Sequence, residues 1–201
     1  MASPFFMTGF FMTGRHAALP MRERSAPRMR SPRLTYRPID ARDAGRVATL
    51  AGDWDIARMT SRIPHPYTIV DADLWIASID DDEFVRAILL GGELIGAVGY
   101  IRHEPKQAEI GYWIGKPWWG NGYATEAART LVDHCFQETG FEQLTCGHFV
   151  DNAGSARVIS KLGFRPIGTG AQWCEARNCE VETVRYARGR PLLDRWRSFM
   201  R

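Results

Sequence analysis

The sequence predicts an α/β (α+β) domain in which helices flank a mixed, mostly antiparallel central sheet. In the first half, strand-like segments follow one another through short turns, and in the second half strands alternate with helices. Consecutive strands favour antiparallel pairing, whereas a β–α–β unit favours parallel pairing, so the two halves together give a mixed sheet. The length of 201 residues and the composition, with 45% apolar and 24% charged residues, fit one globular domain.

Residues 1–31 differ in composition from the rest of the chain. They contain five arginines and a single acidic residue, Glu23, and these charges follow a short apolar stretch instead of preceding it as in a secretory signal. Few acids and several arginines also resemble an organelle transit peptide. Because several methionines precede the first strand-like segment, we interpret residues 1–31 as a basic, flexible N-terminal extension. A single domain is assigned to residues 32–201.

The charge and the cysteines exclude several classes of protein. The net charge of +3 comes from the extension, so we expect the folded body to bind no nucleic acid. No apolar stretch reaches the ~18–20 residues that cross a bilayer, and no membrane association is expected. The four cysteines lack the spacing of a zinc site, so no metal is expected. Without a secretory signal we expect reduced thiols and a cytoplasmic protein.

Capping and turn residues divide the first half of the domain into short elements. Asp40 suits the N-cap of a helix that ends near residue 51, and the pair Gly91-Gly92 suits the two-residue turn of a β-hairpin. Two further short helices are expected over residues 53–60 and 70–79. The expected strands cover residues 34–39, 83–90, 93–102 and 108–114.

The second half contains the longest helical pattern. After residue 122, apolar residues recur at helical spacing as far as Gly140, which suits the left-handed position after a helix. A further helix is expected over residues 152–162 and a short amphipathic helix over 191–200. The remaining strands are expected at residues 141–149, from 164–168 onward, and at 179–186.

Gly120 and Gly122 lie between the strand 108–114 and the long helix. Glycines let the backbone approach a ligand closely, and the free N–H groups at a helix N-terminus, aided by the helix dipole, bind phosphate groups. The segment lacks the Lys-Ser/Thr of a P-loop and the Gly-x-Gly-x-x-Gly of a dinucleotide fold. The pattern therefore predicts a site for a phosphate or pyrophosphate, with a plain turn as the alternative.

The segment Trp119-Gly-Asn-Gly-Tyr-Ala-Thr-Glu-Ala127 resembles the pyrophosphate loop of the GNAT acetyltransferases, whose pattern is Gln/Arg-x-x-Gly-x-Gly/Ala. Gly122 and Ala124 match this pattern, while Trp119 stands in the Gln/Arg position. The resemblance extends over residues 33–187 and is greatest to the RimJ/RimL branch, named for acetylation of ribosomal-protein N-termini. Further segments that are similar to this branch are 64–68, 152–155 and 161–164.

The resemblance implies acetyl-CoA as the co-substrate and a V-shaped opening between two central strands, where the pantetheine arm pairs with backbone. The backbone of Ile114 would hold the pantetheine and face the thioester oxygen, and the loop amides would bind the pyrophosphate. Asn152 would contact the pantetheine arm or only cap its helix, and Lys161 would bind a CoA phosphate or remain solvated. The implied cofactor-binding residues are Ile114, Trp119, Gly120, Asn121, Gly122, Tyr123, Ala124, Thr125, Asn152 and Lys161.

Glu109 is the candidate general base, acting directly or through water. Strand alternation puts it on the same sheet face as Trp113, and the alternative is a strand-end glutamate exposed to water. Many GNAT members carry a tyrosine acid in the helix after the asparagine motif, but Ile159 stands there in this chain. Ser155 is therefore the candidate acid, unless its hydroxyl only serves the helix backbone. His103 has no partner at a suitable spacing and is interpreted as structural.

The resemblance implies transfer of an acetyl group from acetyl-CoA to a primary amine, with a protein N-terminal α-amine as the favoured acceptor. The attacking amine must be neutral, which near neutral pH costs about 0.5–1 kcal/mol for an α-amine but about 4–5 kcal/mol for a lysine side chain. Two alternatives stay open: a small-molecule amine as the acceptor, or a non-catalytic CoA-binding regulatory module. The sequence also leaves a homodimer open.

Overall fold

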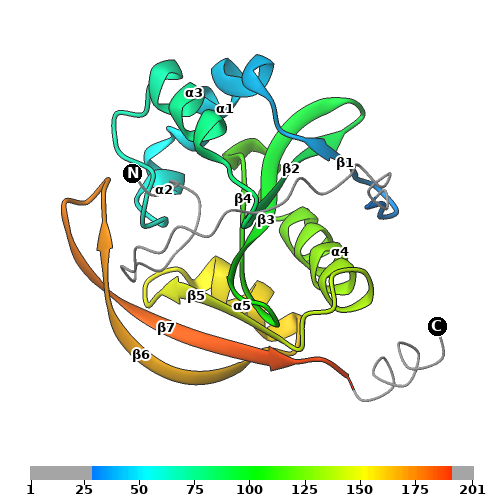
Figure 1. Ribbon diagram of the computed structural model, residues 1–201. Helices are drawn as coiled ribbons and strands as arrows, with labels where there is room; N and C mark the ends of the chain where they lie inside the picture. Colours follow the sequence, from blue (N-terminus) through cyan, green and yellow to red (C-terminus); the bar gives the residue numbers. More distant parts are fainter. Residues whose placement is uncertain (1–28, 192–201) are drawn as a thin grey trace.

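A seven-stranded sheet with helices on both faces forms the centre of the computed structural model, which describes residues 29–191 (Figure 1). The strand order is β1-β2-β3-β4-β5-β7-β6. Among these strands only β4 and β5 pair in parallel, and the other neighbours are antiparallel. The predicted mixed, mostly antiparallel sheet flanked by helices is thereby confirmed. Most of the expected N-terminal extension and the expected C-terminal helix lie outside the described residues.

The elements follow the predicted order. The strands are β1 (Thr35–Pro38), β2 (Glu83–Leu90), β3 (Glu93–Glu104), β4 (Gln107–Ile114), β5 (Gln143–Phe149), β6 (Arg165–Cys174) and β7 (Cys179–Gly189). The α-helices are α1 (Ala44–Ala51), α2 (Trp54–Ala57), α3 (Ile69–Ser78), α4 (Tyr123–Gln137) and α5 (Ala153–Lys161). Two single turns of 3₁₀-helix, η1 (Ala41–Asp43) and η2 (Lys116–Trp118), precede α1 and α4.

The turn and capping residues act as the sequence predicts. Asp40 accepts a hydrogen bond from the Arg42 N–H, and it forms a capping box with Asp43 at the start of η1, which continues into α1. Gly91 and Gly92 both have positive φ, 60° and 90°, as the two-residue turn between β2 and β3 requires. Each of these features uses a local interaction, which explains why a single sequence predicts it.

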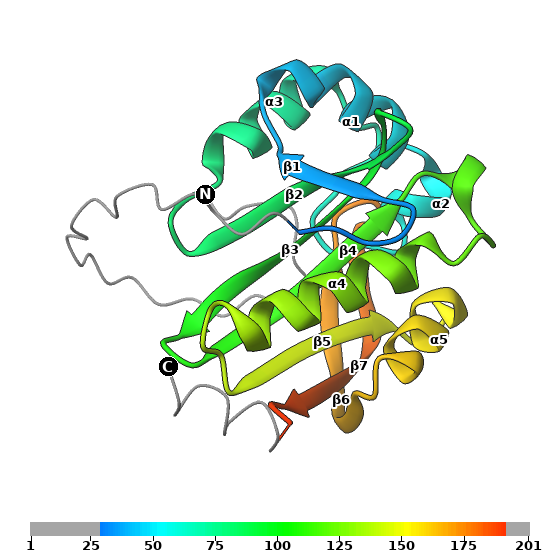
Figure 2. The ribbon, with the colours of Figure 1, turned by 90° about the vertical axis from the view of Figure 1, so that its right-hand side faces the viewer.

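The sheet separates two apolar cores. The core on one face is formed against α4 and includes Ile110 and Ile114 of β4, and the core on the other face is formed against α1, α2 and α3 and includes Trp113 of β4. Figure 2 shows α4 crossing one face of the sheet, with α1 and α3 grouped beyond β1 and β2. The alternation predicted for β4 is therefore confirmed, and this strand faces both cores.

The parallel pair β4–β5 is short and then separates. Its register contains only Gln107↔Gln143, Ala108↔Leu144 and Glu109↔Thr145, although β4 continues to Ile114 and β5 to Phe149. The two strands therefore diverge beyond Glu109 and Thr145, in the V-shaped arrangement that the resemblance implies.

The structure differs from the sequence analysis at both ends of the domain. The folded part already includes Met29, which is 7% exposed in the α4-side core, and Ser31, whose hydroxyl donates to Glu126 at 2.7 Å. Strand β7 is also longer than expected, since it continues to Gly189. Strand β6 begins where expected, but most of its residues are exposed, so no apolar alternation marks its length, and its pairing with β7 holds it.

Candidate active site

The open edge of β4 is the first feature of the site. The Gly115 N–H donates to the Ile95 carbonyl of β3 at 2.8 Å. Because backbone groups along a strand point alternately to the two sides, Gly115 and every second residue before it direct their N–H and C=O groups toward β3. The backbone N–H and C=O groups of Ile110, Tyr112 and Ile114 therefore point into the gap between β4 and β5. A row of such groups can pair with an extended ligand as another strand would.

A cleft of about 670 Å³ runs through this gap. It is lined by the segment around α2, by β4, by the loop before α4, by β5 and by α5, so that it connects the α1–α3 face of the sheet with the α4–α5 face. Every predicted site residue lines it except Asn121 and Glu109. Predicted residues that are up to about fifty positions apart along the chain are thereby collected around one space.

The loop between η2 and α4 presents backbone N–H groups at one end of the cleft. Gly120 and Gly122 both have φ of 80°, and Gly122 is the N-cap of α4 without any side-chain cap. The Asn121 amide donates to the carbonyls of Trp118 and Trp119 at 3.2 and 3.1 Å, which fixes the turn. Uncapped N–H groups at the start of a fifteen-residue helix form a favourable site for an anion.

Trp119 takes part in this site in a way that the sequence did not indicate. Its indole N–H donates to the Ile114 carbonyl at 2.6 Å, although the side chain remains 48% exposed. Of the two backbone groups of Ile114 that face the gap, the carbonyl is therefore already bonded, and its N–H is the group that can serve a ligand. Trp119 adds no charge to the loop.

Glu126 in the first turn of α4 is bound by the segment before β1. Its carboxylate accepts hydrogen bonds from the Ser31 hydroxyl at 2.7 Å and from the Arg33 backbone N–H at 2.8 Å, and it forms an ion pair with the Arg33 side chain. Burial alone raises the pKa of this carboxyl, but these hydrogen bonds and the Arg33 charge outweigh burial, so its pKa lies below the ordinary value. Sequence reasoning missed Arg33 because it is more than ninety positions from Glu126.

Asn152 and Lys161 mark the two ends of α5. The Asn152 side-chain oxygen accepts the Ser155 N–H at 2.9 Å, so Asn152 caps the helix, and the residue also lines the cleft with an amide NH₂ as a further donor group. Lys161 lines the cleft at the last turn, and within residues 29–191 it has no ion-pair partner. Capping and ligand binding are thus compatible for Asn152.

Ser155 is hydrogen-bonded to a second hydroxyl in the cleft. The Tyr112 hydroxyl lies 2.9 Å from the Ser155 oxygen, which joins β4 to α5 across the gap. Burial raises the pKa of Tyr112, with the Ser155 hydrogen bond opposing it, so the phenol keeps its proton at neutral pH. Ser155 was predicted from the sequence and Tyr112 was not, because their proximity depends on how α5 packs against the sheet.

Glu109 lies at the point where β4 and β5 separate, on the face that packs against α1–α3. It is only 4% exposed and does not line the cleft, so the alternative of a water-exposed strand end is wrong. Its carboxylate lies 3.2 Å from the His103 Nε2, and the Arg62 guanidinium is close enough to interact with it. His103, which the sequence analysis interpreted as merely structural, thus belongs to the surroundings of Glu109.

The turn between β6 and β7 is bonded to two residues that line the cleft, Arg58 and Asp151. Arg177 donates from Nε to the Arg58 carbonyl at 2.6 Å and forms an ion pair with Asp151 at 2.9 Å. The Glu175 N–H donates to the Ser61 carbonyl at 2.9 Å. The segment after α2, the end of β5 and this turn are therefore tied together beside the cleft.

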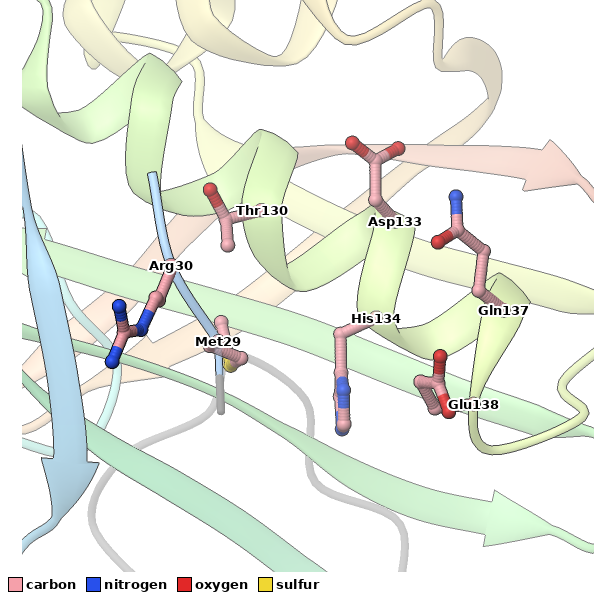
Figure 3. Close-up of a pocket in the computed structure, with 7 residues that line it drawn as sticks. All are labelled: Met29, Arg30, Thr130, Asp133, His134, Gln137 and Glu138. Atoms are coloured by element: carbon pink, nitrogen blue, oxygen red, sulfur yellow. The ribbon is translucent and has the colours of Figure 1, made fainter. Parts of the chain in front are cut away.

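A second, smaller cleft of about 310 Å³ lies on the outer face of α4 (Figure 3). Figure 3 shows Met29 and Arg30 beside the α4 residues Thr130 and His134. Burial lowers the pKa of His134, which stacks on Phe84 with ring centroids 4.9 Å apart. This cleft contains none of the predicted site residues and does not reach the loop before α4. The larger cleft is therefore the candidate active site.

The parted parallel strands and the glycine loop at a helix N-terminus are the two features that the resemblance to the GNAT acetyltransferases implies. The family model of the acetyltransferase (GNAT) domain matches residues 33–165, which is more than half of the chain. The chain therefore belongs to the GNAT acetyltransferase family.

Three curated relatives illustrate the similarity. The chain is 32% identical to the uncharacterized N-acetyltransferase YoaA of Bacillus subtilis over 101 residues, which cover 49% of this chain and 57% of YoaA. It is 27% identical to the uncharacterized N-acetyltransferase p20 of Bacillus licheniformis, over 68% of this chain and 81% of p20. It is 36% identical to the ribosomal-protein-serine acetyltransferase of Escherichia coli over 74 residues, which cover 36% of this chain and 41% of that enzyme.

Solved structures share the fold. A GNAT-family acetyltransferase from Bacillus anthracis has a TM-score of 0.72 at 20% identity, over 81% of this chain and 98% of its own. Mycobacterium smegmatis RimJ in complex with CoA-disulfide has a TM-score of 0.70 at 20% identity, over 78% and 81%. Spermidine N-acetyltransferase from Vibrio cholerae, in complex with CoA and spermine, has a TM-score of 0.68 at 18% identity, over 79% and 96%.

Two further observations concern the part of the chain that the structure describes. No helix within residues 29–191 has the length and apolar character needed to span a membrane. No group of three or more histidine, cysteine or acidic side chains in the same residues is arranged to hold a metal ion.

Proposed function

We propose that this protein transfers an acetyl group from acetyl-CoA to a primary amine, and that the physiological amine is the N-terminal α-amine of a protein. The observation that carries the proposal is the cleft that passes between β4 and β5 from the loop before α4 to the opposite face of the sheet. Such a passage lets a donor approach from one face and an acceptor from the other. Membership of the GNAT family and relatives with ribosomal-protein names support it.

The donor fits the α4–α5 end of the cleft. The diphosphate would bind the N–H groups of residues 120–125, and the pantetheine arm would pair with the open edge of β4 through Tyr112 and the Ile114 N–H. The amide of Asn152 would contact the same arm, and Lys161 would contact a phosphate. Because the arm would extend from the loop past Ile114, the thioester would lie near Ile110, where β4 and β5 begin to separate, and not against Ile114 as the resemblance implies.

The chain's own groups would then serve the transfer as follows. The acceptor amine attacks the thioester carbonyl carbon, a C–N bond forms and the C–S bond breaks. The amine proton passes through water to Glu109, which lies at the point of separation on the acceptor face, with His103 beside it. The departing sulfur resembles a cysteine thiolate of pKa about 8.5, so a hydrogen bond from the Ser155–Tyr112 pair suffices to assist it.

An α-amine acceptor agrees with the energetics of deprotonation. Removing the proton from an α-amine near neutral pH costs about 1 kcal/mol or less, whereas a lysine side chain costs about 4–5 kcal/mol. Glu109 as a single base would therefore suffice for an α-amine, whose deprotonation costs less free energy. If ribosomal proteins are the acceptors, as the name of the Escherichia coli relative states for that enzyme, the reaction takes place in the cytoplasm. A small polyamine is the second candidate acceptor, because one of the solved structures with the same fold is a spermidine N-acetyltransferase.

An acceptor screen tests this proposal. Purified protein and isotopically labelled acetyl-CoA are incubated with short peptides that have free N-termini, with the same peptides blocked by N-formylation, and with polyamines and free amino acids. We expect mass spectrometry to find one acetyl group on the α-amine of the free peptides and none on the blocked ones. Transfer to small amines alone would contradict the protein acceptor, and tight CoA binding without any transfer would favour a regulatory module.

A further inference from the structure

The guanidinium group of Arg33 lies directly beside the loop before α4. Its Nη1 donates to the Asn121 carbonyl at 3.0 Å, and its central carbon lies 4.5 Å from the centre of the Tyr123 ring. A Cβ atom placed on Gly122 would lie 3.6 Å from its Nη2. Arg33 therefore contacts Asn121 and Tyr123 and lies beside Gly122 between them, although it belongs to the segment before β1, which is an edge strand of the sheet.

Arg33 is also held in this position. Its Nε donates to Glu126 at 2.7 Å and its backbone N–H donates to the same carboxylate at 2.8 Å, while Ser31 holds that carboxylate from a third direction. The Glu126 side chain is 13% exposed, so this ion pair is partly shielded from water. Nε donates to Glu126 and Nη1 donates to the Asn121 carbonyl, whereas within the described residues Nη2 makes no hydrogen bond. A preoriented donor group consequently remains beside Gly122.

The loop has little positive charge of its own. Between residues 115 and 125 the single cationic side chain is Lys116, which is paired with Asp55 at 2.7 Å. Trp119 directs its indole to the Ile114 carbonyl and supplies no charge. Glu126 in the first turn of α4 would repel a bound anion if it were unpaired. Arg33 both neutralises Glu126 and brings a cation to the loop.

We propose that Arg33 binds the diphosphate of the CoA donor through Nη2 and, by holding Asn121 and Glu126, keeps the loop amides in position for the same group. This inference rests on the proposed use of acetyl-CoA and adds a residue from outside the loop to the binding site. The planar guanidinium suits phosphate oxygens, and charge-assisted hydrogen bonds of this kind contribute more than neutral ones. The chemical class recognised is the nucleoside diphosphate part of the ligand.

The test compares two ligands that differ in the diphosphate. Calorimetric titrations measure the affinity of wild-type protein, Arg33→Gln and Arg33→Lys for CoA and for pantetheine, which lacks the nucleotide and the diphosphate. Arg42→Gln is the matched control, because Arg42 is an exposed arginine paired with Asp40 at the start of η1. We expect Arg33→Gln to weaken CoA binding about 10–100-fold, the range for a lost charge-assisted hydrogen bond, and to leave pantetheine affinity unchanged.

Arg33→Lys keeps a charge and loses the planar fork, so it should weaken CoA binding by a smaller factor, and Arg42→Gln should change neither affinity. If Arg33→Gln does not fold, the affinities of Arg33→Lys for CoA and for pantetheine, compared with those of the wild-type protein, test the proposal instead. Unchanged CoA affinity in the Arg33 variants would overturn this inference alone, as would equal weakening of CoA and pantetheine. Failure of the wild-type protein to bind CoA would overturn the proposed function and this inference with it.

Discussion

At the scale of single residues, Glu109 shows what alternation along a strand predicts and what it leaves out. The shared sheet face of Glu109 and Trp113 follows from the two-residue period of a strand, because both residues lie in the continuous strand β4, and Trp113 joins the core against α1, α2 and α3. The contact with His103 depends on the register of β3 against β4, which is irregular between Arg102 and Glu104. A register irregularity has no signal in a single sequence.

The same limit explains the other residues that sequence reasoning missed. Tyr112 is next to Ser155 only because α5 packs over the gap, and Arg33 is next to Asn121 only because the segment before β1 crosses to α4. Gly122 and Asn152, in contrast, were predicted from local patterns, a glycine at a helix start and an N-cap residue. Local geometry could be predicted, and contacts between distant segments could not.

The proposed role of Glu109 as the base predicts a specific kinetic change. Glu109→Gln keeps the shape of the side chain and removes its ability to take a proton, so kcat should fall about 100-fold or more, as for the loss of a general base. The KM for acetyl-CoA should stay nearly constant, because Glu109 is not among the residues proposed to contact the coenzyme. Steady-state kinetics with the acceptor found in the screen provide the measurement.

Glu104→Gln is the matched control for this variant. Glu104 is exposed at the end of β3, on the strand that also carries His103, and its change to glutamine should leave kcat as it is in the wild-type protein. A Glu109→Gln protein with normal kcat would remove Glu109 as the base.

At the scale of elements, α4 illustrates how local signals and a distant segment combine. The helix begins after Gly122 and is followed by Gly140 with φ of 78°, as its sequence pattern predicts. Its first turn is nevertheless completed from outside the helix, by hydrogen bonds from Ser31 and Arg33 to Glu126. The length of β7 was underestimated and the end of β6 was not predicted for a related reason, since these strands are held by pairing with each other and not by an apolar pattern.

The lowered pKa of Glu126 predicts how stability changes with pH. A carboxyl whose pKa is lower in the folded state than its ordinary value of about 4.5 stabilises the fold above pH 4.5, and this contribution is lost as the pH falls through the folded-state pKa. Glu126→Gln should therefore be less stable than the wild-type protein at pH 7, by about 1–2 kcal/mol, the magnitude for hydrogen bonds to a charged group. The difference should shrink below pH 4.5.

Urea unfolding of both proteins at a series of pH values measures this difference. Glu138→Gln, a change in a glutamate at the other end of α4, serves as the comparison for a general charge effect. A stability difference between wild type and Glu126→Gln that grew on acidification would contradict the predicted direction.

At the scale of the whole molecule, the arrangement of the sheet explains why one cleft collects the predicted residues. Because β4 and β5 pair over three residue pairs and then separate, the loop before α4 and the start of α5 face each other across the gap. On the opposite face, the turn between β6 and β7 reaches the segment after α2 through Arg177 and Glu175. The placement of β7 between β5 and β6 brings that turn there, and strand order within a sheet is not encoded in any local pattern.

The central claim is that the backbone amides between η2 and α4 bind the diphosphate of acetyl-CoA. A crystal structure of the protein with acetyl-CoA tests it most directly. The account predicts diphosphate oxygens within about 2.7–3.2 Å of N–H groups in residues 120–125, with the pantetheine arm along the open edge of β4. Coenzyme bound elsewhere, for example in the smaller cleft between Met29 and Glu138, with those amides bonded only to protein, would contradict it.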